Sequence, residues 1–358
     1  METKNIGLRN IPIADTKISL IDGEKGKLIY RGFDVLDLTK NSNFEECCFL
    51  LLHDHLPNKI EFNEFTTKLK EARAIPEQMQ KNMKNWRKNA HPMDVLQAFV
   101  AALAGYYDEQ GTEKEISQQR AINLISKVPT IIASWERVRN DKEPIQPDPE
   151  LSHASNFLYM LTGNKPDKEM ERVFDVCLIL HADHTFNAST FAAREVASTR
   201  AHMYSAVSAA VGALSGELHG GANYEVMKML LDIKDENNAT NWVKSRIEKG
   251  DRIMGMGHAV YKTVEETTSE IMKNRKERDI FPNVDLYSAS VYYMLNIPMD
   301  LNTPIFAISR VSGWAAHVIE EKFAEAAPKP MLYRPKATYV GKYEGPQGCN
   351  YIPIEERK

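Results

Sequence analysis

The chain has 358 residues, enough for one large domain or two unequal ones, and its 43% hydrophobic and 26% charged residues are typical of a globular enzyme. A formal net charge of -4 argues against a nucleic-acid-binding or membrane-surface protein. No uncharged apolar run approaches the roughly 18 residues of a membrane helix, and the N-terminus lacks the apolar stretch of a signal peptide. Four cysteines without a CxxC pair are typical of a reducing compartment, so we expect a cytoplasmic protein.

The first expected elements are two short strands. Residues 17–31, KISLIDGEKGKLIYR, contain an Asp-Gly turn between two apolar runs and predict a β-hairpin. Nearly everything after this hairpin has the spacing of helices, beginning with the apolar run from Phe44 to Leu52 that Pro57 follows. Because strand signals are too few for a parallel sheet, the sequence predicts a mostly α-helical fold.

Two later helices carry sharper expectations. The helical pattern of residues 117–139 contains Pro129, which predicts a kink because proline removes a backbone hydrogen bond. Residues 167–184 predict one long amphipathic helix, in which steps of three and four place apolar residues on the same face as His184. We therefore expect His184 at the end of a core-facing stripe.

Polar residues at turns between the expected helices are the candidate functional groups. His219 lies in LHGGAN just before a helix, His258 closes GMGH, and Asp285 follows a Pro-Asn pair. Imidazoles and a carboxylate at such turns suit proton transfer next to a carbonyl, and a helix N-terminus favours a developing oxyanion. Each residue also has a purely structural interpretation: a loop histidine beside a Gly-Gly cap, a plain turn, and the N-cap of the next helix, respectively.

Metal and anion sites are weaker candidates. His181 and His184 form an HxxH spacing, but no HExxH or other strong ligand pattern accompanies it. A core or substrate-facing histidine is the better interpretation, and no metal is expected. Arg310 and Arg334 are candidate clamps for a carboxylate, although a single arginine is more often a surface residue.

Together these segments resemble the citrate synthases of the compact bacterial and archaeal type. The resemblance covers nearly the whole chain through LIDGEKGKLIYRG, HPMDVLQA, NFLYMLTG, HADHTFNASTF, LHGGAN, GMGHAVYKT, PNVDLYS, FAISRVSGWAAH and RPKATYVG. It implies a predominantly helical enzyme that works as a homodimer or a multiple of one. The active site would lie in the cleft between a large domain, residues 1–218 and 306–358, and a small domain, residues 219–305.

The resemblance also implies roles for individual residues. Asp285 would remove a methyl proton from acetyl-CoA, His219 would hold the thioester oxygen of the resulting enolate, and His258 would polarise the oxaloacetate carbonyl. Citryl-CoA would then hydrolyse to citrate and CoA. The residues that would bind oxaloacetate are His184, Arg310 and Arg334, the last in the partner subunit's site.

The loop of Gly255, Met256 and Gly257 would lie near the adenine of CoA. Acetyl-CoA is a co-substrate, so the resemblance implies neither a resident cofactor nor a metal. These roles agree with the chemistry of the residues, because a carbon acid of high pKa needs a placed base and oxyanion donors.

Three departures from the family pattern stand out. Thr267 stands where the family usually has an arginine that clamps an oxaloacetate carboxylate, and losing such a buried charged partner costs about 2–5 kcal/mol. The charged stretch 268–281 is several helical turns shorter than in the family, which trims the small domain. Glu217 replaces the usual proline before Leu-His-Gly-Gly. Nearby cations that could replace the missing arginine are Lys262, Lys273, Arg275 and Arg278.

The sequence thus predicts a citrate synthase and leaves alternatives open. A 2-methylcitrate synthase uses propionyl-CoA with the same machinery, and one methylene discriminates by only about 1–3 kcal/mol. A non-catalytic paralogue would explain the missing arginine, whereas the retention of His219, His258 and Asp285 favours an enzyme. Citryl-CoA cleavage is related chemistry, and a metallohydrolase is the least favoured class.

Overall fold

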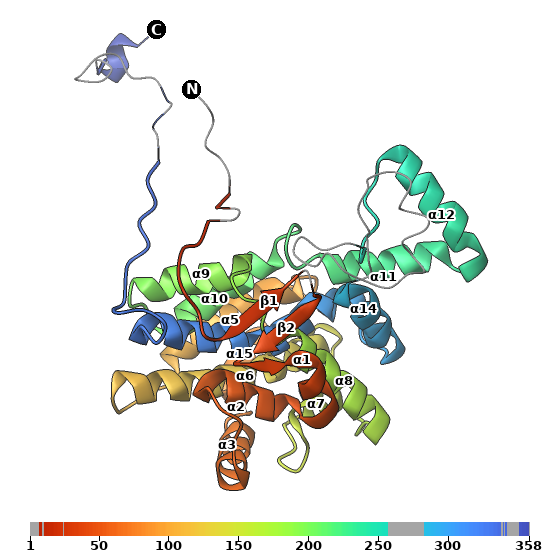
Figure 1. The fold of residues 1–358 in the computed structure, drawn as a ribbon, viewed down its shortest axis with the longest axis horizontal. Helices are drawn as coiled ribbons and strands as arrows, with labels where there is room; N and C mark the ends of the chain where they lie inside the picture. Colours follow the sequence, from red (N-terminus) through yellow and green to blue (C-terminus); the bar gives the residue numbers. More distant parts are fainter. Residues whose placement is uncertain are drawn as a thin grey trace.

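The structure, a computed structural model, describes residues 7–8, 11–23, 25–256, 283–337, 339, 341 and 351–357. The predictions for Gly257, His258, Thr267 and the segment 268–281 concern residues outside these ranges and stay predictions. Within them, the chain is mostly helical with one three-stranded sheet near its N-terminus, which confirms the predicted fold class (Figure 1). None of the helices described combines the length and the apolar character that crossing a membrane requires.

The predicted β-hairpin is present. Strands β1 (Ser19–Asp22) and β2 (Lys27–Tyr30) pair antiparallel with Ser19 opposite Tyr30. A third strand that the sequence did not predict, β3 (Phe33–Asp34), pairs with β2. With only two residues, β3 is too short to produce an alternating pattern, so its pairing follows from the turn that precedes it.

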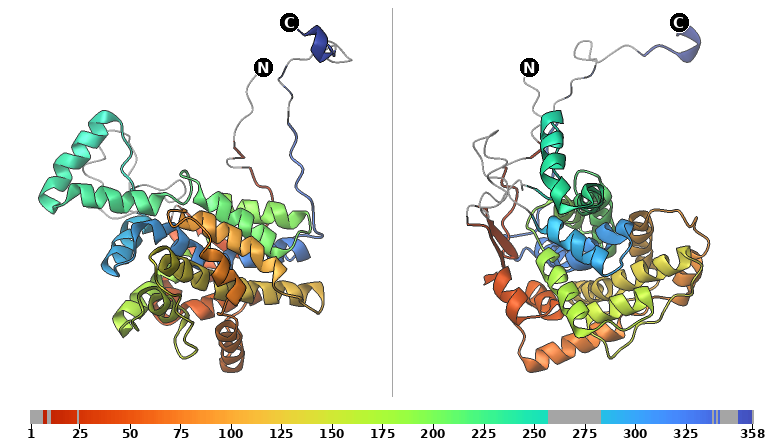
Figure 2. Two further views of the ribbon diagram at one scale, coloured as in Figure 1. Left: turned by 180° about the vertical axis from the view of Figure 1, so that it is seen from behind. Right: turned by 90° about the vertical axis from the view of Figure 1, so that its right-hand side faces the viewer.

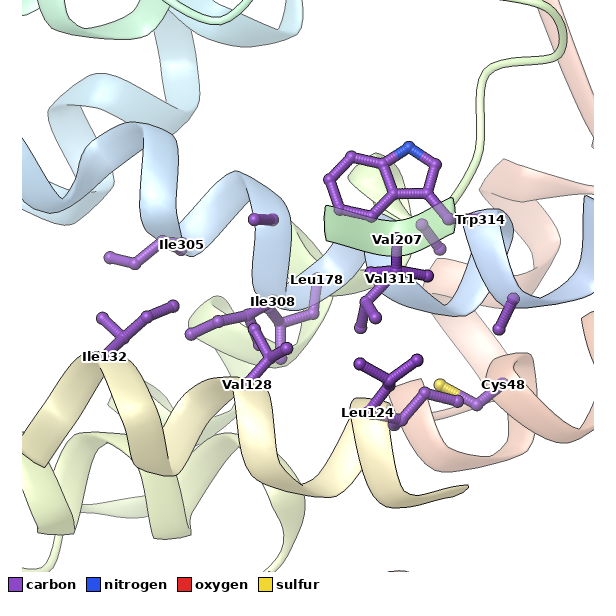
Figure 3. Packing of buried hydrophobic residues seen from close by; sticks show 14 of the residues in the cluster. Cys48, Leu124, Val128, Ile132, Leu178, Val207, Ile305, Ile308, Val311 and Trp314 are labelled. Atoms are coloured by element: carbon purple, nitrogen blue, oxygen red, sulfur yellow. The ribbon is translucent and has the colours of Figure 1, made fainter. Parts of the chain in front are cut away.

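Helices α6 (Glu113–Arg139) and α15 (Asn302–Phe323) form the centre of a large hydrophobic core. Figure 3 shows their side chains pointing toward one another at intervals of three and four residues, as expected for facing helical stripes. The side chains that meet there are Leu124, Val128 and Ile132 from α6 with Ile305, Ile308 and Val311 from α15. Helix α6 continues through Pro129, so proline does not end the helix here.

Shorter helices surround this pair. They are α1 (Val35–Asn41), α2 (Phe44–His53), α3 (Lys59–Glu71), α4 (Glu77–Met83), α5 (Pro92–Ala102), the 3-10 turn η1 (Leu103–Gly105), α7 (His153–Thr162), α8 (Lys168–His181), α9 (Ala188–Ser198) and α10 (Met203–Ser215). Helices α9 and α10 lie along one another, and the small residues of α10 permit this close packing. Both helices pack against α15. The turn that follows α10 therefore begins next to α15.

The long helix predicted to reach His184 was wrong at its C-terminal end, because α8 stops at His181. The Tyr30 hydroxyl accepts from the Asp183 N–H at 3.2 Å and lies 3.1 Å from the Ile179 carbonyl. Those two backbone groups would bond to each other in a continuing helix. A side chain from the distant hairpin therefore replaces the next helical bond, and His184 lies in the loop that follows.

A second, smaller hydrophobic cluster lies beside the body. Its helices are α11 (Ala222–Ile233), α12 (Glu236–Lys249), α14 (Val284–Met294) and the 3-10 turn η2 (Met299–Leu301). Val226 and Met227 of α11 pack there against Ala289 of α14. Helix α11 packs against α14, and α12 projects away from the body (Figures 1 and 2).

The small cluster falls within the predicted small domain, residues 219–305, whose boundaries stay a prediction. Tyr292 of α14 belongs to the large core, where its ring lies 6.2 Å from that of Phe174. Helix α14 therefore contacts both clusters and links them.

The chain ends leave the body on the same side (Figures 1 and 2). After α15 the described residues 331–337 run outward as an arm without regular secondary structure. Pro335 lies in this arm, and proline disfavours helix in the residue before it. The last described segment holds a short 3-10 turn, η3 (Ile354–Glu356).

Candidate active site

His219 lies in the turn between α10 and α11, just before the N-terminus of α11, as the sequence predicts. Gly220 fixes this turn against α15: its carbonyl accepts a hydrogen bond from the Thr303 hydroxyl at 2.8 Å. A Cβ at position 220 would lie 2.0 Å from the Leu214 carbonyl oxygen, so only glycine fits. Glu217, which replaces a proline of the family pattern, is exposed on the same turn.

The imidazole of His219 has a defined tautomer. The backbone N–H of Ser189 donates to Nε2 at 3.2 Å, and the Ser189 hydroxyl lies 2.8 Å from the same nitrogen. Because a backbone N–H can only donate, Nε2 accepts and Nδ1 carries the proton. Burial, followed by the charge of Arg310, lowers the pKa of His219 to about 4. The ring is therefore a neutral N–H donor near pH 7.

Ser189 is itself held by two side chains that the sequence did not single out. Its hydroxyl donates to Asn187 Oδ1 at 2.7 Å and accepts from Trp314 Nε1 at 3.2 Å. Asn187 is also the N-cap of α9, where Oδ1 accepts from the Thr190 N–H. The Asn-x-Ser pattern before a helix signals that cap, but only the fold brings Trp314 to it.

Asp285 is not the N-cap that its local sequence suggested. Asn283 caps α14, and its side chain accepts from the Asp285 N–H at 3.0 Å. Asp285 is thus in the first turn, with its carboxylate free of the capping role. Burial raises the pKa of Asp285, while a hydrogen bond from Asn223 and the charge of Arg310 oppose this rise. A carboxylate with a raised pKa is a stronger base.

Arg310 connects these groups. It is 3% exposed on α15, where its Nε donates to the His181 carbonyl at 2.7 Å and its guanidinium lies 4.5 Å from the Phe306 ring. The same guanidinium lowers the pKa of His219 and counteracts the rise at Asp285. His219 comes from the turn before α11, Asp285 from the first turn of α14 and Arg310 from within α15. The fold therefore brings the three side chains close enough for the charge of Arg310 to act on both other groups.

Two other predicted substrate ligands are placed differently. His184 is half-buried in the loop between α8 and α9, close in sequence to the Asn187–Ser189 pair that supports His219. Arg334 is exposed on the arm that follows α15. His181, the first histidine of HxxH, is a core residue, since it is 1% exposed and its Nδ1 donates to the Cys177 carbonyl at 2.8 Å.

The predicted CoA loop is described up to Met256. Gly255 has a positive φ of 71°, and a Cβ there would lie 2.8 Å from Val226 Cγ2, so the position requires glycine. Its carbonyl accepts from the Asn283 N–H at 2.9 Å. This bond joins the loop to the N-cap of α14, and so to the turn that carries Asp285. In the described part of the chain, no three His, Cys, Asp or Glu side chains are grouped as metal ligands would be.

Comparison with known proteins agrees with this architecture. Residues 7–266 and 262–336 match the family model described as "Citrate synthase, C-terminal domain". The chain belongs to the citrate synthase family. A curated relative, citrate synthase from Haloferax volcanii, is 37% identical over 98% of this chain and 98% of its own length. 2-Methylcitrate synthase 1 from Corynebacterium glutamicum is 36% identical, also over 98% of each chain.

Solved structures of citrate synthases share the fold. The Thermoplasma acidophilum enzyme, in a ternary complex with carboxymethyl coenzyme A and oxaloacetate, aligns with a TM-score of 0.87. It is 31% identical, and the alignment covers 100% of both chains. Citrate synthases are acyltransferases, so membership of the family identifies this protein as an enzyme of that type.

Proposed function

We propose that this chain is a citrate synthase, which condenses acetyl-CoA with oxaloacetate and water to give citrate and CoA. One observation supports this function best: a neutral N–H donor, His219, and a carboxylate of raised pKa, Asp285, share the electrostatic influence of buried Arg310. A base and an oxyanion donor in one place are what proton removal from a thioester methyl group requires.

In the proposed first step, Asp285 takes a methyl proton from acetyl-CoA. Because the pKa of Asp285 is raised, it differs less from the pKa of the carbon acid, and the proton transfer is less unfavourable. The Nδ1–H of His219 donates to the thioester oxygen as negative charge develops there. The bond from the Ser189 backbone N–H to Nε2 keeps Nδ1 protonated and holds the ring in place.

In the proposed second step, the enolate carbon attacks the oxaloacetate carbonyl. Arg310 and His184 bind the dicarboxylate, and Arg334 reaches it from the partner of a homodimer. The outward direction of the arm supports the assignment to a partner. His258, outside the described residues, polarises the carbonyl. Water then cleaves citryl-CoA, and neither a resident cofactor nor a metal takes part.

A cytoplasmic location completes the proposal. Cys47, Cys48 and Cys177 are buried free thiols, and burial raises the pKa of Cys47 and of Cys177 to about 12. Unreactive buried thiols are in line with a reducing compartment.

The second candidate function is 2-methylcitrate synthesis from propionyl-CoA. The similarity to a relative with that name favours it, at nearly the same identity as to the citrate synthases. Since the machinery is shared, the two functions differ only in how the acyl chain is accommodated.

Release of the CoA thiol tests both functions. We expect release from acetyl-CoA that requires oxaloacetate, persists with a chelator, and falls about 10²–10⁴-fold in Asp285→Asn, the usual contribution of a general base. Faster release from propionyl-CoA would favour the second function. No release from folded protein with either thioester would contradict both.

Heat stability then separates an enzyme from a non-catalytic paralogue. We expect oxaloacetate to raise the unfolding temperature in a saturable manner, because a ligand that binds only the native state stabilises it. The Asp285→Asn variant should keep this shift, since its change leaves the dicarboxylate ligands intact. An inactive wild-type protein without the shift would be a paralogue that has lost its dicarboxylate site.

A further inference from the structure

A buried cluster of charged side chains lies between the loop of His184 and the C-terminal arm. Its members, which we call the Arg194 cluster, are Asp183, Arg194, His317, Glu320 and Glu321. Asp183 and His317 are 0% exposed, and the exposed fraction of the others does not exceed 8%. Burying three carboxylates costs free energy unless each is paired, so the cluster has a well-defined arrangement.

Arg194 stands at the centre of the cluster. Its Nη1 lies 2.6 Å from Glu320 Oε2, and its Nη2 lies 2.7 Å from Glu321 Oε2. The same Nη1 donates to His317 Nδ1 at 3.0 Å. Because a guanidinium can only donate, Nδ1 accepts and the proton of His317 is on Nε2.

The His317 ring connects Arg194 to the loop that carries His184, through Asp183. Its Nε2 lies 3.2 Å from Asp183 Oδ1, an electrostatic contact rather than an aligned hydrogen bond. The other carboxylate oxygen of Asp183 accepts from the Thr185 N–H at 2.9 Å and from the Ser19 hydroxyl. His184 is therefore held between two residues that share one hydrogen bond.

Asp183 remains charged in this environment. Burial acts to raise its pKa, but His317, the Arg310 guanidinium and the Ser19 hydroxyl outweigh burial and lower the pKa to about 2. An ionised Asp183 accepts hydrogen bonds at every physiological pH, so its bond from the Thr185 N–H holds the loop in one conformation.

The opposite end of the cluster holds the arm. Tyr333 donates its hydroxyl to Glu321 Oε2 at 2.6 Å, and its ring is stacked on Phe191 with centroids 6.0 Å apart. Its backbone N–H donates to Ser198 Oγ at 3.3 Å. Arg334 is the next residue, so the arm is anchored one position before the predicted ligand.

We propose that the Arg194 cluster positions two predicted oxaloacetate ligands, His184 at one end and Arg334 at the other. Both are one residue away from a side chain that the cluster holds. Since Arg334 is proposed to act in the partner's site, the cluster links the dicarboxylate sites of the two subunits. The inference rests on the proposed function for the identity of the ligand.

Tyr333→Phe is the mildest test, because it removes one hydroxyl and keeps the stacked ring. We expect the KM for oxaloacetate to rise about 10-fold, the effect of one hydrogen bond to a charged group, with kcat and the KM for acetyl-CoA near wild type. Tyr351→Phe, which removes the hydroxyl of a tyrosine that is 80% exposed, is the matched control and should change nothing.

Amide hydrogen exchange provides a readout independent of turnover. In Tyr333→Phe we expect faster exchange at the Thr185 amide, whose bond to Asp183 lies at the far end of the cluster. The control variant should leave this amide unchanged.

A pair of variants at position 317 tests the middle of the cluster. The amide of His317→Gln offers an acceptor to Arg194 and a donor to Asp183, so it should keep both readouts near wild type. His317→Leu offers neither and should raise the KM for oxaloacetate and the Thr185 exchange rate together. If the leucine variant does not fold, Tyr333→Phe still decides the question.

Three outcomes distinguish the two proposals. Unchanged Thr185 exchange in Tyr333→Phe would overturn the cluster as a link, and faster exchange with an unchanged KM for oxaloacetate would overturn its role in positioning. A wild-type protein without oxaloacetate-dependent CoA release would instead contradict the proposed function. Coupled exchange in that protein would then support the link between loop and arm alone.

Discussion

Half-buried His219 and fully buried His317 show how the same side chain serves different ends in this fold. His219 has one nitrogen occupied by Ser189, and among the described residues Nδ1 has no hydrogen-bond partner. His317 has Arg194 at one nitrogen and Asp183 at the other. A ring with an available donor can act on a ligand, whereas a ring with both nitrogens engaged can only hold its neighbours in place.

The two surroundings differ in charge as well. At His219 burial leads the lowering of the pKa to about 4, and the charge of Arg310 adds to it. His317 is set among the carboxylates and the guanidinium of the Arg194 cluster, where Arg194 pairs with both Glu320 and Glu321. The charge network around His317 holds its neighbours in fixed positions, whereas the neutral N–H of His219 is suited to stabilise an oxyanion.

The largest effect should come from replacing the available donor. We expect His219→Gln to lower kcat about 10²–10³-fold, the usual loss on removal of an oxyanion donor, while the unfolding temperature changes little. Steady-state kinetics of oxaloacetate-dependent CoA release measure this, with His55→Gln, on the protein surface, as control. A loss below threefold would mean that His219 resembles His317 in being structural.

The turn that carries His219 should be the next most sensitive position. Gly220→Ala places a methyl group 2.0 Å from the Leu214 carbonyl, so the turn must move away from α15. We expect a loss of about 2–4 kcal/mol in the free energy of unfolding, as for other overpacked or strained sites, together with reduced kcat. Denaturant titration measures the loss. Gly250→Ala, at a position with open space but positive φ, should cost about 1 kcal/mol.

Stability below neutral pH should report the neutral state of His219. The unfolded chain binds a proton at this side chain near pH 6.5, whereas the folded protein resists protonation until about pH 4. The stabilising contribution is therefore complete above pH 6.5 and is lost as pH falls through 4. We expect about 1–3 kcal/mol of the acid-induced destabilisation to disappear in His219→Gln, allowing for partial exposure.

Denaturant titrations of wild type and variant between pH 7 and 4 check this expectation. Identical slopes of stability against pH would show that His219 is protonated as readily in the fold as in the unfolded chain. In that case the neutral-donor mechanism would fail, whatever the kinetics of the variant.

The smallest effect should come from the support of His219. Ser189→Ala removes a hydroxyl bonded to Asn187 and Trp314, but the backbone N–H at position 189 still donates to Nε2. We expect kcat to fall about 10-fold, typical for a residue that orients a catalytic group. Ser215→Ala, at an exposed position whose hydroxyl donates to Gly212 of the same helix, is the kinetic control. A loss as large as that of His219→Gln would mean that the Ser189 hydroxyl, and not the backbone N–H, determines the tautomer of His219.

Much of the fold was predictable because its signals are local. The hairpin, the run from Phe44 and the mostly helical class all follow from periodicity and turn residues within about fifteen positions. The position of His219 just before a helix was predictable in the same way. The individual roles proposed for the site residues came from the resemblance to a family and await the tests above.

Local signals failed where a distant side chain competes with the backbone. The Tyr30 hydroxyl ends α8 before it reaches His184, although the periodicity of the sequence continues. At Asp285, two good capping residues lie within three positions, and the geometry of the turn selects Asn283. Periodicity and propensity cannot rank such alternatives, because the deciding bond has no local pattern.

By itself the sequence determined which segments are helical, which turns carry polar residues and which family the chain resembles. Only the tertiary structure decided which nitrogen of His219 bears the proton, that Arg310 influences both His219 and Asp285, and that a charged cluster joins the loop of His184 to the arm of Arg334. The physical reason is range: helix formation depends on neighbours three or four residues away, whereas tautomers and buried ion pairs depend on contacts over longer separations. His219 and Ser189 are 30 positions apart, and Arg194 and His317 are 123 positions apart.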